Sequence, residues 1–369
     1  MTSKERVKAT LRHEEPDRVP VGEFAIDYAL IEKVIGHETY YRGKAKMIMA
    51  LWEGRRDEVV ESQKKDLVEF TRKAGLDTVC VNMVPARNAV FDKPRRLDDR
   101  TWEDCCGNIL RYSELTHDLM LLKRGDHPEN APEQPPPDGS EWELWDYVVQ
   151  ELGETHYIFA RDVGGSPPVG YAEAWGEQQF IDMLEKPEEV AEARMRAARS
   201  IRSKVELALS RGADAMFLGE DYGHNHGPFV SPQLFRRVIF PSLKVLCDEV
   251  HATGTPVLFH SCGKNDLILD QMVEAGVDCY QAIQMYEDIV EYKRLYGDRL
   301  SLWGGVDVRT LATGTPDDVR REARYALRHC APGGGFILGS SHSITIDVTY
   351  DNFMAMLEVA HREGQYPIA

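Results

Sequence analysis

The sequence has no long apolar run. None of its segments holds the roughly 18 uncharged apolar residues that a membrane-spanning helix needs. The first 20 residues are polar and charged, without the apolar core of a signal peptide. We therefore expect a cytoplasmic protein with no membrane partner.

Basic residues are also scarce relative to acidic ones. Lys and Arg number 44 against 61 Asp and Glu, which gives a formal net charge of -17. Nucleic acids and anionic membranes are bound through clustered cations, so this balance argues against both as partners. It also disfavours a polyanionic substrate.

The sequence lacks a disulfide framework and Gly/Ser-rich linkers. Its seven cysteines are an odd number without regular spacing. In a chain without an export signal, this predicts reduced thiols. Without linkers to separate domains, we expect one domain over residues 1–369.

What the sequence does contain is an alternation of short, β-rich apolar runs with longer helical segments. This alternation is typical of a parallel sheet built from βα units, and eight strands are the number that closes a barrel. The eight runs are "VPVGE" (19–23), "TVCVNM" (78–83), "YIFARD" (157–162), "AMFLGE" (215–220), "VLFHSC" (257–262), "CYQAIQ" (279–284), "LSLWGG" (300–305) and "FILGSS" (336–341).

The first two βα units carry additional sequence. Residues 24–75 have the pattern of two or more helices, and residues 97–123 that of a hairpin. Residues 125–146 are rich in proline and acidic residues, which predicts an exposed loop. The predicted fold is a single α/β (β/α)8 TIM barrel with elaborated N-terminal helices and a hairpin/loop insertion.

Polar residues gather at the C-terminal ends of the apolar runs, where a βα barrel places its chemistry. The alternative for Asp162, Asp221 and Asp307 is that each caps the following helix. The strand-end residues are Glu23, Arg161, Asp162, Glu220, Asp221, His260, Cys262, Gln284, Asp307 and His342.

His260 and Cys262 form the most suggestive pair. Residues two apart on a strand share one face, so both side chains can converge on one ion. Imidazole and thiolate are donors that zinc prefers. The alternative is a buried thiol beside a histidine that hydrogen-bonds to a neighbouring loop.

Further ligands would come from neighbouring strand ends. We rank Glu220 and His342 first because each lies close to the end of its run. His224 and His226 lie two apart in a Gly-bounded loop, where they are ligands, substrate contacts or solvated side chains.

Several segments resemble the uroporphyrinogen decarboxylase superfamily, especially its cobalamin-dependent methyltransferase-like branch. The resemblance extends across nearly the whole chain and implies a (β/α)8 barrel with its active site at the C-terminal face. The segments are "SKERVKATLRHEEPDRVPV", "GEDYGHNHGPFVSPQLFRRVIFPSLK", "FHSCG", "LWGGVDVRTLATGTPDDV" and "GGGFILGSSHSITIDVTYDNFMAM".

The resemblance leaves two activities to choose between. Decarboxylases of this superfamily are metal-free and carry arginines just after the first strand for the substrate's carboxylates. Here that stretch is "PVGEFAIDYALIEK", with Glu23 and Asp27 and no arginine after Arg18. Acids at this place would repel a polycarboxylate, which disfavours decarboxylation.

The methyltransferases that this chain resembles carry His-x-Cys at the position of His260 and Cys262. They commonly have a third zinc ligand, a cysteine, after the last strand, where this sequence offers His342. The resemblance thus implies Zn2+ and a corrinoid (cobalamin) carried by a partner protein, and it hints at a homodimer. Because the decarboxylases also keep a histidine there, His342 as a substrate contact is the alternative.

The ligand set bears on the direction of methyl transfer. Zinc with one thiolate is more electrophilic than zinc with two, which favours a role for zinc as a Lewis acid that activates a methyl donor. We therefore predict methyl transfer from an O-methyl donor, a methoxylated aromatic or a small methyl ether, to the Co(I) of a corrinoid protein. The alternatives are transfer from methylcorrinoid to a thiol or another carrier, a metal-free lyase, and a non-catalytic corrinoid or tetrapyrrole-binding scaffold.

For this reaction we assign roles to the candidate residues. Glu220, Asp221 and His224 are predicted to orient or protonate the leaving oxygen. Aromatic residues near the mouth suit an aryl ring, although core packing is the alternative for each of them. The predicted metal ligands are His260, Cys262, His342 and Glu220; the predicted substrate contacts are Glu23, Tyr28, Tyr222, His226, Gln284 and Trp303; further aromatics are Phe24, Tyr171 and Trp175.

Overall fold

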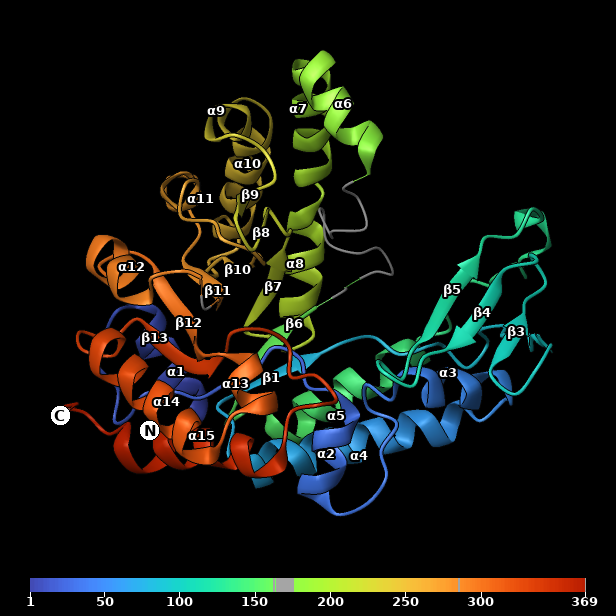
Figure 1. Cartoon of the computed structure of the whole chain (residues 1–369), viewed down its shortest axis with the longest axis horizontal. Helices are drawn as coiled ribbons and strands as arrows, with labels where there is room; N and C mark the ends of the chain where they lie inside the picture. Colours follow the sequence, from blue (N-terminus) through green and yellow to red (C-terminus); the bar gives the residue numbers. More distant parts are fainter. Residues whose placement is uncertain (162, 164–175, 285, 369) are drawn as a thin grey trace. The chain divides into compact units, whose positions relative to one another are not determined.

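The computed structural model describes residues 1–161, 163, 176–284 and 286–368. The chain forms two compact units (Figure 1). Unit 1 comprises Met1–Ala25, Ala74–Asn82 and Val149–Ala369, and unit 2 comprises Ile26–Lys73 and Met83–Val148. One domain over the whole chain stays a prediction.

Unit 1 is built on a curled sheet of seven parallel strands, whose order follows the chain. Parallel neighbours need crossover connections, and helices supply them here. The apolar runs after the first are therefore confirmed as strands. They are β1 (Thr78–Val81), β6 (Tyr157–Ala160), β7 (Ala215–Gly219), β10 (Leu258–His260), β11 (Cys279–Ile283), β12 (Ser301–Val306) and β13 (Phe336–Ser340).

The first predicted strand, residues 19–23, is reduced to a single bridge between the two edges of the sheet. Val21 pairs in parallel with Leu338 of β13, whose N–H donates to the Pro20 carbonyl over 2.9 Å. On the other side, the N–H of Asp77 donates to the Val21 carbonyl over 2.7 Å. Proline has no N–H, so Pro20 cannot extend the ladder. The result is a TIM-barrel-like fold with a minimal eighth strand.

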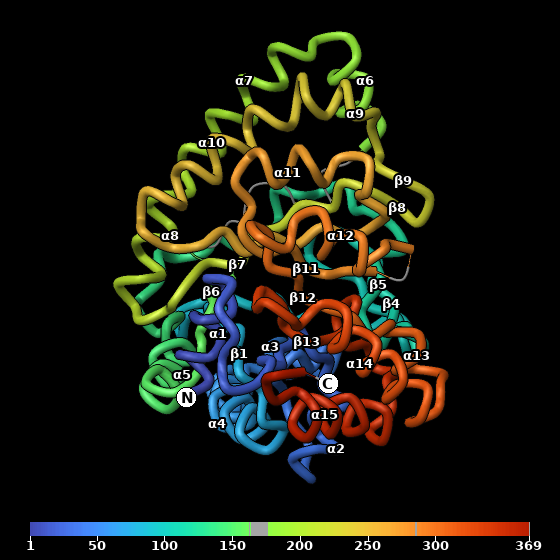
Figure 2. The backbone as a smooth tube through the Cα atoms, turned by 90° about the vertical axis from the view of Figure 1, so that its left-hand side faces the viewer, coloured from blue at the N-terminus to red at the C-terminus, as the bar shows by residue number. Residues whose placement is uncertain are grey.

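Helices cover the outside of the sheet in unit 1 (Figure 2). Ser231 and Thr315 are N-caps whose hydroxyls accept backbone N–H groups, as the Ser-Pro and Thr-Pro starts suggest. The helices are α1 (Ser3–Leu11), α6 (Glu177–Glu185), α7 (Pro187–Ala198), α8 (Ile201–Ser210), α9 (Pro232–Leu234), the π-helix η4 (Phe235–Ile239), α10 (Phe240–His251), α11 (Leu269–Ala275), α12 (Ile289–Tyr296), α13 (Val308–Thr313), α14 (Pro316–Cys330) and α15 (Tyr350–Glu363). A short ribbon, β8 (Gly223–His224) with β9 (Gly227–Pro228), follows β7.

Aromatic side chains fill the barrel interior. The ring of Trp303 lies edge-on to Phe159 and Phe217, with centroids 5.5 and 5.7 Å apart. Phe24 stacks on Phe217 at 5.4 Å. All four side chains are buried, so the interior is a packed core and not a channel.

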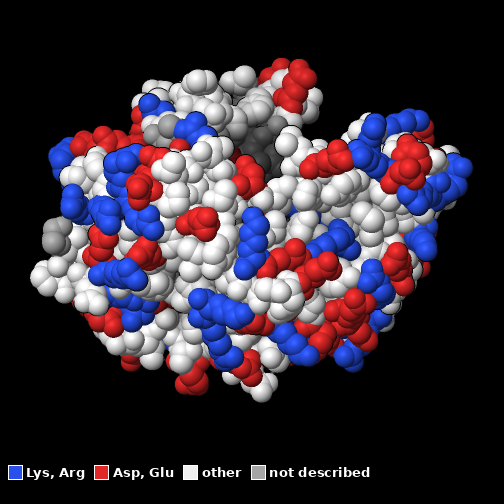
Figure 3. All heavy atoms as spheres, turned by 60° about the horizontal axis from the view of Figure 1, so that its bottom comes forward, with Lys and Arg blue, Asp and Glu red and all other residues white. Residues whose placement is uncertain are grey.

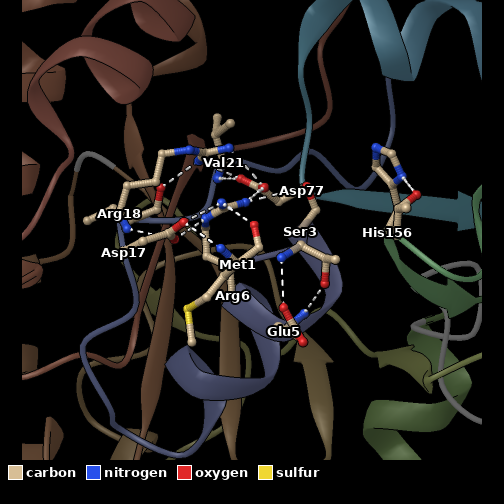
Figure 4. Close-up of polar contacts among 12 residues, drawn as sticks. Met1, Ser3, Glu5, Arg6, Asp17, Arg18, Val21, Asp77 and His156 are labelled. Atoms are coloured by element: carbon tan, nitrogen blue, oxygen red, sulfur yellow. Dashed lines mark hydrogen bonds and ion pairs between the residues drawn. The ribbon is translucent and has the colours of Figure 1, made fainter.

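At the N-terminal end of the barrel, the buried carboxylate of Asp77 binds two arginines (Figure 4). Arg6 donates to it over 2.6 Å, and Arg18 donates over 2.7 and 2.9 Å. The N–H of Val21 adds a bond of 2.7 Å, and Asp17 binds the other side of Arg6 at 2.7 Å. This cluster ties the first helix and the first strand to β1, which is a structural role.

Unit 2 combines helices with an antiparallel sheet. The hairpin predicted within residues 97–123 corresponds to β4 and β5 and is part of a larger sheet of order β2-β3-β4-β5. In this sheet β2 and β3 are joined by a turn in which the Leu97 N–H donates to the Thr101 carbonyl. The helices predicted within residues 24–75 are confirmed. The elements are α2 (Tyr28–Ile35), α3 (Lys44–Trp52), α4 (Arg56–Ala74), β2 (Arg95–Arg96), β3 (Thr101–Glu103), β4 (Ile109–Tyr112), β5 (Leu119–Lys123), the 3-10 helices η1 (Pro128–Asn130) and η2 (Ser140–Trp142), and α5 (Glu143–Leu152).

Three further features bear on the composition: the helices, the surface charges and the cysteines. Across the described ranges, each helix is too short or too polar to cross a membrane. Figure 3 shows Lys and Arg side chains interleaved with Asp and Glu over one face. The seven cysteines, all within the described ranges, form no disulfide.

Candidate metal centre

Three potential ligands converge at the C-terminal ends of β7 and β10. The ligand atoms of Asp221, His260 and Cys262 all lie within 4.8 Å of one another. Cys262 Sγ is 3.3 Å from His260 Nε2, which is 3.5 Å from Asp221 Oδ1. No other group of three or more His, Cys, Asp or Glu residues gathers in this way within the described part of the chain.

The spacing of these atoms fits a tetrahedral zinc ion. With metal–ligand bonds of about 2.0 to 2.3 Å, neighbouring ligand atoms of a tetrahedron lie about 3.3–3.6 Å apart. Both measured separations agree with this range. Three protein ligands are also the number typical of catalytic zinc sites.

His260 is held in the orientation that a metal ligand needs. Its Nδ1 lies 2.5 Å from Oε1 of Gln281, its register partner on β11. An amide oxygen only accepts, so Nδ1 donates and the Nε2 lone pair faces Cys262 and Asp221. On β7, a Cβ at Gly219 would lie 3.0 Å from the His260 Cβ and from its carbonyl oxygen, so the glycine lets the two strands approach closely at this point.

The turn after β10 fixes Cys262. Its backbone N–H donates to Asp221 Oδ1 over 2.8 Å. Buried Asn265 donates from Nδ2 to the carbonyls of Cys262 and Gly263 over 3.1 and 3.2 Å. Gly263 has a φ of +94°, and a Cβ there would lie 2.1 Å from the Gly223 carbonyl carbon. The turn therefore requires glycine and an inward-facing amide.

Burial dominates the electrostatics of this centre. It lowers the pKa of His260, against the opposing charge of Asp221, and the charges of His342 and Arg161 lower it further. Burial and then the Asp221 charge raise the pKa of the Cys262 thiol. A bound cation would instead lower the pKa of the Cys262 thiol, because it stabilises the thiolate.

Glu220, which we predicted as a ligand, has a different partner. Its Oε2 lies 2.5 Å from Nη2 of Arg194 on α7, and the Tyr222 hydroxyl also hydrogen-bonds to it. Burial raises the pKa of Glu220, and the charge of Arg194 opposes this. The place predicted for Glu220 in the ligand group is occupied by its neighbour, Asp221.

His342 lies outside the group of three, although its charge acts on His260. Its Nδ1 is 3.3 Å from the Ser343 carbonyl. Nearby, buried Glu23 accepts the N–H of Ser340 over 2.8 Å and contacts its hydroxyl at 2.5 Å. That hydroxyl also contacts the His342 carbonyl, so its one proton cannot serve both acceptors. A protonated Glu23 resolves this, and burial raises the pKa of Glu23 to about 8.

Gln284, a predicted substrate contact, supports the Cys262 turn. Its Oε1 accepts the N–H of Gly263 over 3.0 Å. His224 and His226 are exposed at the β8–β9 ribbon, where the His226 N–H lies 3.2 Å from His224 Nδ1.

The predicted aromatic contacts fall in several environments. Tyr222 is buried and stacks on Phe259, with centroids 5.7 Å apart. Trp303 is buried and donates from Nε1 to the Gly22 carbonyl over 3.0 Å. Core packing accounts for both. Tyr28 belongs to unit 2, where its hydroxyl lies 2.6 Å from His117 Nδ1; Asp162, Tyr171 and Trp175 lie outside the described residues.

Some residues of the site were missed in the sequence. Gln281, Asn265 and Arg194 each hold a candidate residue in place. Gln281 had a readable signal, because it is a polar residue inside the apolar run "CYQAIQ". For Asp307, the capping alternative is confirmed, since its carboxylate accepts the N–H of Arg309 at the start of α13 over 3.0 Å.

Comparison with known proteins adds relatives in two activity classes. A 138-residue stretch is 29% identical to the methylcobamide:CoM methyltransferase MtaA of Methanosarcina barkeri, over 37% of this chain and 38% of that protein. A 224-residue stretch is 21% identical to the uroporphyrinogen decarboxylase of Dichelobacter nodosus, over 60% of this chain and 57% of that protein. The chain thus spans 38% and 57% of the lengths of these two relatives.

A solved structure matches almost the whole chain. A methyltransferase from Methanosarcina mazei superposes with a TM-score of 0.65 at 17% identity, covering 98% of each chain. This likeness establishes the fold. The Uroporphyrinogen decarboxylase (URO-D) family model matches residues 172–363, just over half of the sequence, and the chain belongs to this family.

Proposed function

We propose that this protein is a zinc-dependent methyltransferase that works with a corrinoid protein. The convergence of Asp221, His260 and Cys262 carries this proposal, because it supplies three zinc donors at the end of the barrel where this fold performs chemistry. The similarity to a methylcobamide:CoM methyltransferase supports it.

The composition of the ligand group favours an oxygen-bound methyl donor. When bound, zinc supplies a Lewis acid for the atom that the methyl group leaves. One thiolate beside an imidazole and a carboxylate donates less electron density than two thiolates would. A methoxylated aromatic or a small methyl ether is therefore the proposed donor, and Co(I) of the corrinoid protein the acceptor.

The chain's own residues prepare the site for this reaction. Gln281 keeps the Nε2 lone pair of His260 directed into the ligand group. Asp221 binds the Cys262 N–H and so fixes the turn that presents the thiol. His342, which follows β13 and lies outside the ligand group, is the proposed proton donor to the leaving oxygen.

Transfer from methylcorrinoid to a thiol is the second candidate. It is favoured by the 29% identity to the methylcobamide:CoM methyltransferase of Methanosarcina barkeri. In this direction zinc would hold the acceptor as a thiolate, and the two directions share one ligand group.

A metal-free decarboxylase is disfavoured by the position of Arg18. Arg18 is bound by Asp77 at the opposite end of the barrel. The C-terminal end of the first strand carries Glu23 instead of a cation. We expect no decarboxylation of uroporphyrinogen, measured as product by chromatography.

The decisive experiment combines metal analysis with an assay of methyl transfer. Mixed with a reduced corrinoid protein and methoxylated aromatics, the enzyme should convert Co(I) to methyl-Co(III), seen in the visible spectrum. Asp221→Asn should weaken zinc binding and slow the reaction, whereas Asp307→Asn, which changes a helix cap at another strand end, should preserve both. Consumption of methylcorrinoid by a thiol, with no reaction of any O-methyl donor, would select the second direction. A wild-type protein that binds no zinc would refute both directions of zinc-dependent methyl transfer.

A further inference from the structure

Two adjacent cysteines, Cys105 and Cys106, lie in the turn between β3 and β4 of unit 2. Both side chains are half-buried, and their Sγ atoms are 4.0 Å apart without a disulfide. Consecutive side chains of a strand point to opposite faces, so it is the turn that brings these two sulfurs together. The candidate metal centre belongs to unit 1, and the proposed function makes no use of this pair.

The carboxylate of Asp104 fixes the shape of this turn. Its Oδ1 accepts the backbone N–H groups of Cys106 and Asn108, each over 2.9 Å. Its Oδ2 accepts the side-chain amide of Asn108 over 2.8 Å. An aspartate that binds backbone N–H groups a few residues further on stabilises a turn. The backbone that carries both thiols is therefore held in one conformation.

Neighbouring segments of unit 2 hold the same backbone. The Cys105 N–H donates to Asp92 Oδ2 over 3.0 Å, and the Cys105 carbonyl accepts from Asn130 Nδ2 over 3.2 Å. The Cys106 carbonyl accepts the N–H of His127 over 3.2 Å. These contacts engage the backbone groups of the two cysteines and not their sulfurs. The thiols are thus presented by a supported turn.

The distance between the two sulfurs suits one bridging atom. In a tetrahedral zinc site, Zn–S bonds of about 2.3 Å place two sulfurs about 3.8 Å apart, so an atom with bonds of this length reaches both thiols. Among the residues that the structure describes, no third His, Cys, Asp or Glu ligand gathers with them. Two ligands are too few for zinc, which takes three or four from a protein. They match a soft, thiol-binding atom with two open valences, such as trivalent arsenic that already carries one carbon substituent.

The protons of the thiols favour the same class of ligand. Burial, the hydrogen bond to Asp92 and the neighbouring thiol raise the pKa of Cys105. A metal cation would have to displace the thiol protons. An arsine oxide uses them instead, because its oxygen leaves with both protons as water. The product carries no charge, so the negative charge of Asp92 does not repel it.

We propose that Cys105 and Cys106 form a dithiol site that binds a trivalent organic arsine oxide. The reaction joins R–As=O and two thiols into R–As(S–Cys)2 and one water. The bonds between arsenic and oxygen break, two As–S bonds form, and arsenic stays trivalent, so neither an oxidant nor a reductant is required. This inference is independent of the proposed function.

The first test uses phenylarsine oxide and intact-protein mass spectrometry. The reduced wild type should take up one phenylarsine group per chain, keep it in excess glutathione and release it to a dithiol. Cys105→Ser and Cys106→Ser should each weaken this retention at least about 100-fold, because a single thiol cannot chelate. Cys262→Ala, which removes the one other cysteine of the seven that is not buried, is the control and should keep the adduct. Thermal unfolding of each variant checks the fold.

Two results of this test would overturn the proposal. One is a wild-type protein that retains no phenylarsine group in glutathione. The other is an adduct that survives in either serine variant, since this would place the arsenic on other thiols. Loss of the adduct in Cys262→Ala alone would move the site to the candidate metal centre and overturn it as well.

A second test asks whether the turn prepares the pair. Asp104→Ala removes the carboxylate that fixes the turn, so the retention of phenylarsine should fall about tenfold although both thiols remain. Asp98→Ala is the matched control, because Asp98 accepts the Arg100 N–H over 2.7 Å in the preceding turn, between β2 and β3. It should retain the group as the wild type does. Equal retention by Asp104→Ala and the wild type would show that any two adjacent thiols suffice and would overturn the role of the turn.

Discussion

The two ends of the barrel hold acids in opposite situations. At the N-terminal end, Asp77 meets the guanidinium groups of Arg6 and Arg18, which neutralise it. At the C-terminal end, Asp221 shares its surroundings with the imidazole of His260 and the thiol of Cys262, and the three ligand atoms face one point. The difference teaches that an acid serves stability where the chain supplies the cation, and that an acid beside an imidazole and a thiol, as in the proposed zinc site, can accept a cation from outside.

The largest expected effect is the loss of metal on removing the thiol. Cys262→Ala deletes one of three donors, so zinc affinity should fall by more than about 100-fold, beyond the range of changes outside the ligand group. Methyl transfer should be abolished, and urea-induced unfolding of the metal-free forms should change little. Elemental analysis of the variant and the wild type measures this. Retention of zinc by the variant would show that the three residues are not the ligand group.

The reverse result is expected at the N-terminal end. Asp77→Ala leaves two arginines without their buried counter-charge, which should destabilise the fold by about 3–5 kcal/mol in urea denaturation. Asp17→Ala is the matched control: its side chain is 43% exposed, and the loss should be about 1 kcal/mol or less. The folded fraction of both variants should bind zinc as the wild type does. A neutral Asp77→Ala would mean that the cluster is not a structural tie.

An intermediate effect is expected from the residue that orients His260. Gln281→Ala frees the imidazole to rotate, so zinc affinity should fall about 10–100-fold without loss of the ligands. Gln271→Ala removes another buried glutamine, whose Nε2 donates to the Pro232 carbonyl over 3.1 Å, and should leave zinc affinity unchanged. Competition with a chromophoric chelator measures both. Equal losses in the two variants would indicate a general loss of stability.

The smallest effect concerns pH. Burial raises the pKa of Glu287, whose carboxylate accepts the N–H of Gln284, from its ordinary value of 4.5 to about 7. Between these values the unfolded chain releases the proton first, so the stability that protonated Glu287 provides is lost as pH rises. From pH 5 to pH 6 the wild type should lose about 1 kcal/mol relative to Glu287→Gln. Urea denaturation at both pH values tests this slope, and parallel curves would contradict it.

The alternation of apolar runs was sufficient to predict the parallel strands. A run such as "VLFHSC" combines β-branched and aromatic residues over a strand's length, and these properties are local. The same locality explains the weak point, since "VPVGE" was predicted as a full strand and forms only the Val21 bridge. The sheet of unit 2 was underestimated because β2 and β3 are too short for a hydrophobic pattern to register.

The sequence alone predicted that His260 and Cys262 lie together, because their spacing of two at the end of an apolar run is a local feature. Only the tertiary structure decided that Asp221, and not Glu220, completes the group. The two acids are adjacent in sequence, but they have different partners. Arg194 on α7 binds Glu220, whereas the Cys262 N–H in the turn after β10 binds Asp221. Gln281 likewise meets His260 only through the register of two strands. Such partners are set by contacts between segments far apart in the chain, and local patterns do not encode them.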